Sequence, residues 1–297
     1  MTDTFSAKHI RLEYPEPAIA RIVMDRADAA NAQDTQFLYE LNQAFDRAAA
    51  DDEVRVIVLA ANGKHFSAGH DIRERNHHDN QEQFAAVTPF QQHRRPGAEG
   101  RMAREEELYT GLCERWRNLP KITIAAVQGK CISGGLLLCW PCDLIVAADD
   151  AQFQDVTVAM GIAGVEWFAY PWEMGARKAK EMLLTGDPID AESAMRLGMV
   201  NRVVPRHHLE DETLALARRV AAQPTFATKM VKQAVNAAID AQGRPAAFQT
   251  AFALHHLAHS HAMELFGVPV DPGGIHQGVK KSYAPGDEPF RAARERE

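Results

Sequence analysis

The chain alternates between short apolar runs and longer stretches whose apolar residues recur at helical spacing. Residues 10–24 contain two runs of alternating character separated by Pro15 and Pro17, which predicts a β-hairpin near the edge of a sheet. From Asp34 the apolar positions fall on one helical face, and residues 54–61 then predict a further strand. Strand, helix and strand in succession indicate an α/β fold.

A glycine turn between two buried strands is the most informative stretch of the chain. Residues 122–127 and 143–148 are β-branched apolar runs that predict strands, and Gly134-Gly135 between them opens a short apolar helix. Free N–H groups at such a helix start favour a bound anion, or an oxygen that gains charge during a reaction. A tight turn without a ligand is the alternative. Gly135 stands where a nucleotide P-loop has its lysine, which excludes that motif.

The remaining segments differ in character. Residues 76–104 are polar and predict a mobile loop or lid, and residues 104–119 then predict a helix. Amphipathic helices are predicted in succession over residues 177–184, 190–197, 209–222, 225–240 and 245–266. The chain after Phe266 is rich in glycine and proline, so we expect it to be irregular apart from residues 277–283.

The composition is informative mainly because it excludes classes of partner and location. A chain of 297 residues can bury a large core in one domain, or in one domain with a helical extension. The net charge of −7, with no broad basic face, argues against a nucleic-acid partner. No apolar run is long enough to span a bilayer, the start lacks a signal core, and the four cysteines lack a disulfide framework. We therefore expect a cytoplasmic protein with no membrane partner.

Cysteine and histidine spacings raise two metal interpretations, and neither is favoured. Cys139 and Cys142 have the spacing of half a zinc site or of a redox pair. The other two cysteines, Cys113 and Cys131, have no close partner to complete four ligands, so buried apolar cysteines are predicted. Four histidines have i, i+4 spacing near the C-terminus: His255, His256, His259 and His261. They lack the H-E-x-x-H context, so an interface or surface position is expected and no metal site is predicted.

Two glycine loops together resemble the enoyl-CoA hydratase/isomerase (crotonase) superfamily. Residues 66–72, Phe-Ser-Ala-Gly-His-Asp-Ile, resemble that family's F-x-A-G-x-D-L loop. Residues 129–153 resemble its G-x-x-x-G-G-G…C-D…A…A-x-F block, and residues 183–204 its L-T-G…A…A…G-L-V-x-x-V segment. The likeness runs in order from about residue 10 to about residue 240, and the combination is specific.

The resemblance implies a fold, a substrate class and an assembly. Residues 1–205 would form a ClpP-like, right-handed spiral of ββα units, and residues 206–297 a C-terminal helical region with an irregular tail. This helical region usually supports a homotrimer or a dimer of trimers. Family members bind acyl-CoA thioesters and stabilise an enolate at the thioester carbonyl, and no separate cofactor is implied because CoA is part of the substrate.

The resemblance also carries residue roles. The backbone N–H groups of His70 and Gly134 would form the oxyanion hole, and each such donor can be worth about 3 kcal/mol where negative charge develops. Lys64 matches a position near the nucleotide end of CoA, with an ordinary solvated charge as the alternative. Further substrate contacts are expected from Ser67, Ala68, Asp71, Ile72, Gly135, Leu137 and Thr157, although Asp71 also fits a scaffold role.

The acid/base residues depart from the family pattern. Hydratases use two glutamates, whose positions fall here at Leu137 and Thr157, and neither side chain can act as a base at neutral pH. The isomerase branch, which keeps the second glutamate, is not matched either. Dehalogenase-like relatives carry an acidic residue where this chain has Val165, so Glu166 on the opening turn of a helix is one candidate. Asp155, two residues before Thr157, is the other.

Several interpretations stay open at this point. Glu166 could instead favour a helix N-terminus, and the His70 imidazole could shuttle a proton or simply be packed. We expect a lyase or isomerase of enoyl-CoA hydratase type with a non-standard acid/base set. The alternative is an acyl-CoA-binding homologue that has lost catalysis. A third hypothesis uses Ser67 or Ser133 as a nucleophile with a histidine, because the spiral fold also occurs in serine peptidases.

Overall fold

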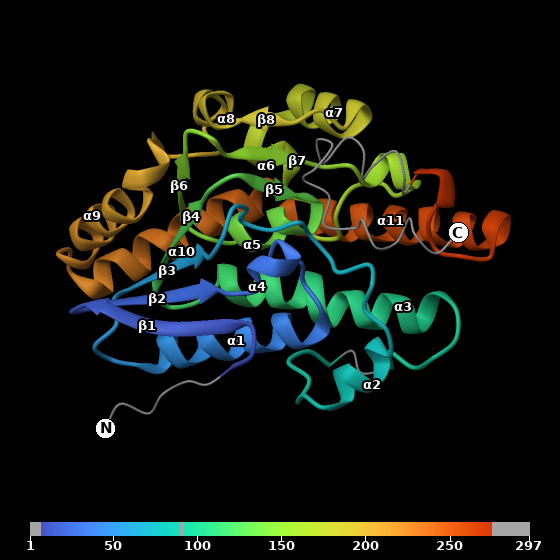
Figure 1. The fold of residues 1–297 in the computed structure, drawn as a ribbon, viewed down its shortest axis with the longest axis horizontal. Coiled ribbons are helices and arrows are strands. Elements are labelled where there is room, and N and C mark those ends of the chain that lie inside the picture. The colour runs from blue at the N-terminus through green and yellow to red at the C-terminus, as the bar shows by residue number, and fades with distance from the viewer. Residues whose placement is uncertain (1–6, 90–91, 275–297) are drawn as a thin grey trace.

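A six-stranded sheet forms the centre of the computed structural model, which describes residues 7–89 and 92–274 (Figure 1). Its strand order is β1-β2-β3-β4-β6-β9. The strands are β1 (Ile10–Glu16), β2 (Ile19–Met24), β3 (Val56–Ala61), β4 (Ile122–Val127), β6 (Leu144–Ala148) and β9 (Arg202–Val204). β1 is antiparallel to β2, and the other neighbours are parallel, as expected when helices connect successive strands.

The predicted hairpin is confirmed as β1 and β2 at the edge of this sheet. Ile10 pairs with Met24, and the register shifts between Glu13 and Glu16. Pro15 lies inside that irregular stretch, where its missing N–H costs no ladder hydrogen bond.

A second, three-stranded sheet was not predicted. It has the order β5-β7-β8 and consists of β5 (Lys130–Ile132), β7 (Gln152–Gln154) and β8 (Ile189–Asp190). Strands of two or three residues are too short to show an alternating pattern in the sequence. The chain passes from the large sheet to the small one twice in succession, from β4 to β5 and from β6 to β7. This alternation is what the expected spiral of ββα units requires.

Helices cover both faces of the large sheet. Ile57 and Leu59 of β3 belong to the main core with Phe37 of α1 (Thr35–Ala50), whose first turn is capped by the Asp34 carboxylate. Val56 and Val58 face the opposite way and pack with residues of α9 (Leu209–Ala221). The remaining α-helices are α2 (His77–Glu82), α3 (Ala98–Glu105), α4 (Leu112–Arg117), α5 (Leu136–Cys139), α6 (Tyr170–Met174), α7 (Ala176–Thr185), α8 (Ala191–Leu197), α10 (Thr225–Ala241) and α11 (Arg244–Phe266).

The prediction of a loop over residues 76–104 is wrong for α2 and α3. α3 continues through the π-helical turn η2 (Glu106–Gly111) into α4, so the helix predicted to begin at residue 104 begins at Ala98. The segment before it is held to the core by the buried Glu107 carboxylate. This carboxylate accepts hydrogen bonds from the backbone N–H groups of Val87 and Thr88 and from the Tyr39 hydroxyl.

The last third of the described chain is helical, as predicted. α10 and α11 run along one side of the molecule, with α11 extending beyond the sheets towards α3 (Figure 1). Within residues 7–89 and 92–274, none of the helices combines the length and apolar character needed to cross a membrane. The segment 277–283, which was excepted from the predicted irregular tail, lies outside the described residues, and the domain division at residue 205 stays a prediction.

Candidate active site

The two glycine loops lie against each other. Ser67 N donates a hydrogen bond to Lys130 O at 3.2 Å, and Ile132 N donates to Ser67 O at 3.0 Å, so the loops are joined like adjacent parallel strands. A Cβ atom added to Gly69 would lie 3.1 Å from Gly134 N. Main chain from two regions more than 60 residues apart therefore meets at the predicted oxyanion hole. Within the described ranges, neither the His70 nor the Gly134 amide donates to a carbonyl outside its own element.

Gln33 holds these loops together and was missed in the sequence. Its Nε2 donates to Gly134 O at 2.8 Å, and its backbone N donates to Gly69 O at 2.8 Å. The side chain is buried in the turn before α1, and 101 positions separate it from Gly134. Nothing in a local sequence pattern signals such a contact, which only the folded chain creates.

Neither candidate serine has a histidine partner in the part of the chain that the structure describes. Ser67 Oγ is buried and donates to Asn31 O at 2.8 Å. Ser133 Oγ accepts from Val156 N at 3.2 Å and lies 3.5 Å from Asp155 Oδ1. Both hydroxyls support the loop backbone, and an arrangement of nucleophile, base and orienting group is not formed.

The His70 side chain lies directly over Gly134. A Cβ atom on Gly134 would be 2.6 Å from His70 Cε1 and 2.7 Å from Nδ1, so the imidazole occupies the space that any side chain would need. The ring also stacks on Tyr109, with 4.0 Å between the ring centroids. Its Nδ1 atom is buried and makes no hydrogen bond among the described residues.

Glu166 reaches the same point from the other side. Its Oε2 lies 3.2 Å from His70 Nε2, and the residue is buried, with 5% of its surface exposed. Burial alone would raise the pKa of Glu166, but the charges of His70 and His255 outweigh it and hold the pKa below its ordinary value. The expected helix position is wrong, because Glu166 lies in a bend before α6. The carboxylate is therefore aimed by tertiary contacts, and a helix N-terminus plays no part.

Asp155, the second acid/base candidate, has both carboxylate oxygens engaged. Oδ1 accepts from Thr157 N at 2.6 Å, and Oδ2 accepts a hydrogen bond from the Tyr170 hydroxyl. Tyr170 in turn accepts from Val165 N at 3.0 Å, which anchors the segment carrying Glu166. Burial raises the pKa of Asp155. These contacts favour a scaffold role in which Asp155 supports the segment before Glu166.

The two positions at which hydratases carry glutamates hold uncharged side chains here. Leu137 is buried in α5, within the main core. Thr157 is buried beside the glycine loops, and its Oγ1 has no hydrogen-bond partner within the described chain. Gly135 approaches Ser67 so closely that an added Cβ would lie 2.8 Å from Ser67 O. This close approach accounts for the second glycine of the turn.

The other predicted substrate residues lie at the rim of the first loop. Asp71 forms an ion pair with Arg26 at 2.8 Å. Burial alone would raise the pKa of Asp71, but the Arg73 amide and the Arg26 charge outweigh burial and lower it. This pairing supports the scaffold role considered for Asp71. Ile72 is 53% exposed and Lys64 is exposed, so both can face a ligand that approaches from solvent. Ala68 packs against the apolar side chains next to the second loop.

Three of the four C-terminal histidines are buried within the chain, near Glu105 and Glu166, and not at the interface or surface position that was expected. His255, His256 and His259 face the Glu105 carboxylate of α3, and only His261 is exposed. Burial would lower the pKa of His255, but Glu105 and Glu166 raise it to about 9. His255 Nε2 lies 3.7 Å from Glu166 Oε1, so this cluster adjoins the His70–Glu166 pair. Glu105, His255 and His259 present three possible metal-ligand atoms within 4.8 Å of one another.

A large cavity lies elsewhere in the molecule. It has a volume of about 770 Å³ and is lined by residues of α6, α10 and α11 together with the chain around Trp140. His70, Gly134 and Glu166 are not among its lining residues. Glu173 is, and burial raises the pKa of this carboxyl to about 8. All four cysteines are unpaired thiols, and Cys113, Cys131 and Cys139 are buried as predicted.

The chain is similar to proteins of one family over most of its length. A model of the enoyl-CoA hydratase/isomerase family matches residues 15–267. EchA13 of Mycobacterium tuberculosis, provisionally named an enoyl-CoA hydratase, is 43% identical over 280 residues, which cover 92% of this chain and 87% of that protein. The crystal structure of a probable enoyl-CoA hydratase from Mycobacterium thermoresistibile matches with a TM-score of 0.80 and 49% identity, over 89% of this chain and 99% of that chain. The 4-chlorobenzoyl coenzyme A dehalogenase-2 of an Arthrobacter species is 32% identical over 77% of this chain and 78% of its own length.

Proposed function

The chain belongs to the enoyl-CoA hydratase/isomerase family of acyl-CoA enzymes, and from this premise we propose how its own residues act on an enoyl-CoA thioester. The thioester carbonyl accepts hydrogen bonds from the backbone amides of His70 and Gly134. The His70 imidazole, held by Glu166, moves the proton at the acyl chain. Leu137 and Thr157 take no part in proton transfer.

The contact between the two glycine loops supports the first half of the proposal. A Cβ atom built on Gly69 would lie 3.1 Å from Gly134 N, and this close approach of the two main chains supports a shared oxyanion site for the His70 and Gly134 amides. Donors fixed in advance by the fold stabilise an enolate without reorganising, and losing one such donor typically costs about 3 kcal/mol. Gln33 fixes the separation of the loops by bonding to both.

The single observation that carries the second half is the 3.2 Å contact between His70 Nε2 and Glu166 Oε2. An ionised Glu166 carboxylate can only accept a hydrogen bond, so it holds the proton of a neutral His70 ring on Nε2. Nδ1 is then left as the lone-pair atom, buried and without a partner in the described chain, and it lies over Gly134. A histidine whose tautomer is fixed by a carboxylate is a recurring general base.

One acid–base pair suits isomerisation better than hydration. A double-bond shift needs a base that removes a proton from one carbon and returns it to another, which a single imidazole can do. Adding water requires a second group to activate the water, and that glutamate is replaced by Leu137. We therefore place double-bond isomerisation of an enoyl-CoA first and hydration second.

The test is the Glu166→Gln variant on a panel of enoyl-, hydroxyacyl- and acyl-CoA thioesters. The amide keeps a hydrogen-bond acceptor for His70 Nε2 and loses the charge, so turnover is expected to fall by about 100-fold or more while acyl-CoA binding persists. Mass spectrometry of the product separates isomerisation, which leaves the mass unchanged, from hydration, which adds one water.

Glu192→Gln, on the exposed surface of α8, is the matched control and should keep full turnover. Unchanged turnover in Glu166→Gln removes the His70–Glu166 pair from the mechanism. If the unsubstituted protein binds acyl-CoA and converts no member of the panel, the alternative holds, and the chain is an acyl-CoA-binding homologue without activity.

The proposal extends to the surroundings of the site. Lys64, exposed at the start of the first loop, contacts the nucleotide end of CoA. The proton transfer itself requires no cofactor beyond the CoA of the substrate. The protein assembles as a homotrimer or a dimer of trimers and works in the cytoplasm.

A further inference from the structure

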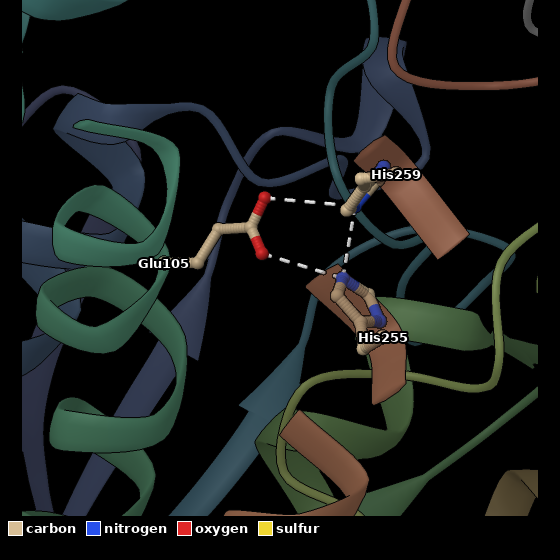
Figure 2. Close-up of side chains that lie close together, drawn as sticks. All are labelled: Glu105, His255 and His259. Atoms are coloured by element: carbon tan, nitrogen blue, oxygen red, sulfur yellow. Dashed lines mark hydrogen bonds and ion pairs between the residues drawn. The ribbon is translucent and has the colours of Figure 1, made fainter. Parts of the chain in front are cut away.

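A cluster of one glutamate and three histidines lies buried between α3 and α11. Figure 2 shows Glu105 projecting from α3 towards His255 and His259, which stand one turn apart on α11. His255 and His259 are 2% and 6% exposed, and Glu105 is 9% exposed. Buried groups of this kind are normally paired, protonated or bound to a metal, because water cannot solvate them.

The two facing histidines have their tautomers set by backbone carbonyls. His255 Nδ1 contacts Gly164 O at 2.8 Å, and His259 Nδ1 contacts Pro269 O. A carbonyl oxygen can only accept, so both Nδ1 atoms carry the proton. In the neutral rings both Nε2 atoms then present lone pairs, and these atoms lie 2.9 Å apart. Two lone pairs facing each other repel, so a cation must lie between them, either a proton shared by the two rings or a metal ion bound to both.

The distances among the three side chains fit a metal ion. Glu105 Oε2 lies 3.3 Å from His255 Nε2, and Glu105 Oε1 lies 3.7 Å from His259 Nε2. A metal with bonds of about 2.0–2.2 Å separates neighbouring ligand atoms by about 2.8–3.6 Å between octahedral and tetrahedral geometry. The contacts of 2.9 Å and 3.3 Å lie within this range, and the 3.7 Å contact would shorten slightly on binding. Two histidines and one carboxylate on one side of an ion leave its other positions open.

The surroundings supply outer partners and negative charge. Carbonyl bonds to Nδ1 orient metal-binding histidines in known sites, as Gly164 and Pro269 do here. His256 Nε2 lies 3.1 Å from Glu105 Oε2 without making a hydrogen bond, and Glu105 Oε2 has no hydrogen-bond partner within the described ranges. Glu166 adds a second buried carboxylate, with Oε1 3.7 Å from His255 Nε2. A histidine that binds a metal through Nε2 is neutral, and one divalent cation would then balance the two buried carboxylates.

We propose that Glu105, His255 and His259 bind a divalent first-row transition metal such as Zn²⁺ or Co²⁺, next to the His70–Glu166 pair. Imidazole nitrogens and a carboxylate suit these ions, whereas Ca²⁺ and Mg²⁺ prefer oxygen ligands only. The site departs from the expectation that these histidines hold no metal. It stands independently of the proposed isomerase activity, because its evidence is the ligand geometry alone.

Metal binding is measured directly on the full chain after chelator treatment and dialysis. Titration with Co²⁺, followed by visible absorption, should show one equivalent bound per chain, and Zn²⁺ should compete for it. His259→Ala removes a ligand, so Co²⁺ affinity should fall by more than the roughly 10- to 100-fold that losing an outer partner costs. Zn²⁺ should raise the melting temperature of the unsubstituted protein and leave that of His259→Ala unchanged.

His261→Ala is the matched control, because His261 is on the same helix but exposed and outside the cluster. It should bind Co²⁺ like the unsubstituted protein. Glu105→Gln provides a second ligand variant if His259→Ala does not fold, as judged by circular dichroism. The proposal is overturned if the unsubstituted protein takes up no Co²⁺ or Zn²⁺, or if both ligand variants bind as tightly as the control. These readouts do not depend on turnover, so a failed Glu166→Gln test leaves them intact.

Discussion

Gly134 must lack a side chain because the His70 imidazole occupies the space that a Cβ atom would need. The backbone of Gly134 is not in the left-handed region, so an alanine there is conformationally allowed and the close contact is the main obstacle. This places two demands on one residue. Its amide is the proposed oxyanion donor, and its bare α-carbon makes room for the proposed base.

Gly134→Ala should therefore impair both the stability and the chemistry. The added methyl group would lie 2.6–2.7 Å from two atoms of the His70 ring, so we expect a loss of stability of about 1–3 kcal/mol and a fall in turnover. Denaturant unfolding measures the first and the thioester assay the second. Combining Gly134→Ala with His70→Ala should restore most of the stability, because the clash is then absent. Additive losses in the double variant would contradict the described ring position.

For single residues, the sequence indicated which chemistry is available, but it did not show which residues far apart along the chain come into contact. The two empty glutamate positions directed attention to Glu166, which the structure brings to His70. Gln33 and Glu105 could not be found in the same way, because their partners are more than a hundred residues away along the chain. An interface or surface position was predicted for His255 and its neighbours because helical spacing alone does not show which side of α11 packs against another helix.

Among the elements, the short helix α6 carries a glutamate, Glu173, whose pKa is raised. Glu173 lines the cavity below α6, and burial raises the pKa of its carboxyl to about 8. In the unfolded chain a glutamate ionises near pH 4.3. Between these values the folded state keeps a proton that the unfolded state has released, so stability falls as the pH rises.

Glu173→Gln should remove this dependence. The variant should match the unsubstituted protein below about pH 4 and become more stable than it towards pH 8, by on the order of 1–2 kcal/mol, given partial screening by solvent. Thermal unfolding at several pH values measures the difference. Glu192→Gln on α8 serves as the exposed control. Parallel curves for Glu173→Gln and the unsubstituted protein would show that the Glu173 carboxyl ionises normally when folded.

The long elements were predictable and the short ones were not. The strands of the large sheet and the helices of the last third carry clear periodic patterns over five or more residues, apart from three-residue β9. The small sheet escaped notice because β5, β7 and β8 each have three residues or fewer. The polar composition hid α2 and α3, which are joined by individual hydrogen bonds such as those from Arg104 of α3 to His77 and Gln81 of α2.

The whole molecule presents an apolar surface along its C-terminal helices. Large hydrophobic side chains are exposed on α10 and α11, at Phe226, Val231, Val235, Leu254, Leu257 and Leu265. Val231 and Val235 also line the 770 Å³ cavity. Contiguous exposed apolar side chains are typical of protein interfaces, which fits the proposed trimer or dimer of trimers.

Val235→Asp should disrupt this assembly. A charge in the apolar contact costs desolvation without a partner, so light scattering after size-exclusion chromatography should show a shift to monomers. Gln43→Asp is the control, because residue 43 is exposed on α1, outside the apolar surface of α10 and α11. A monomeric unsubstituted protein, or an unchanged oligomer in Val235→Asp, would contradict the proposed interface.

α11 connects the outer surface of the molecule to the proposed active site. Its leucines face outward, while His255 on the same helix touches Glu166. Neighbouring subunits that pack against α11 would thereby restrict the motion of Glu166, which orients the proposed base His70. Dilution that dissociates the subunits should therefore abolish turnover at concentrations at which the individual chains are still folded.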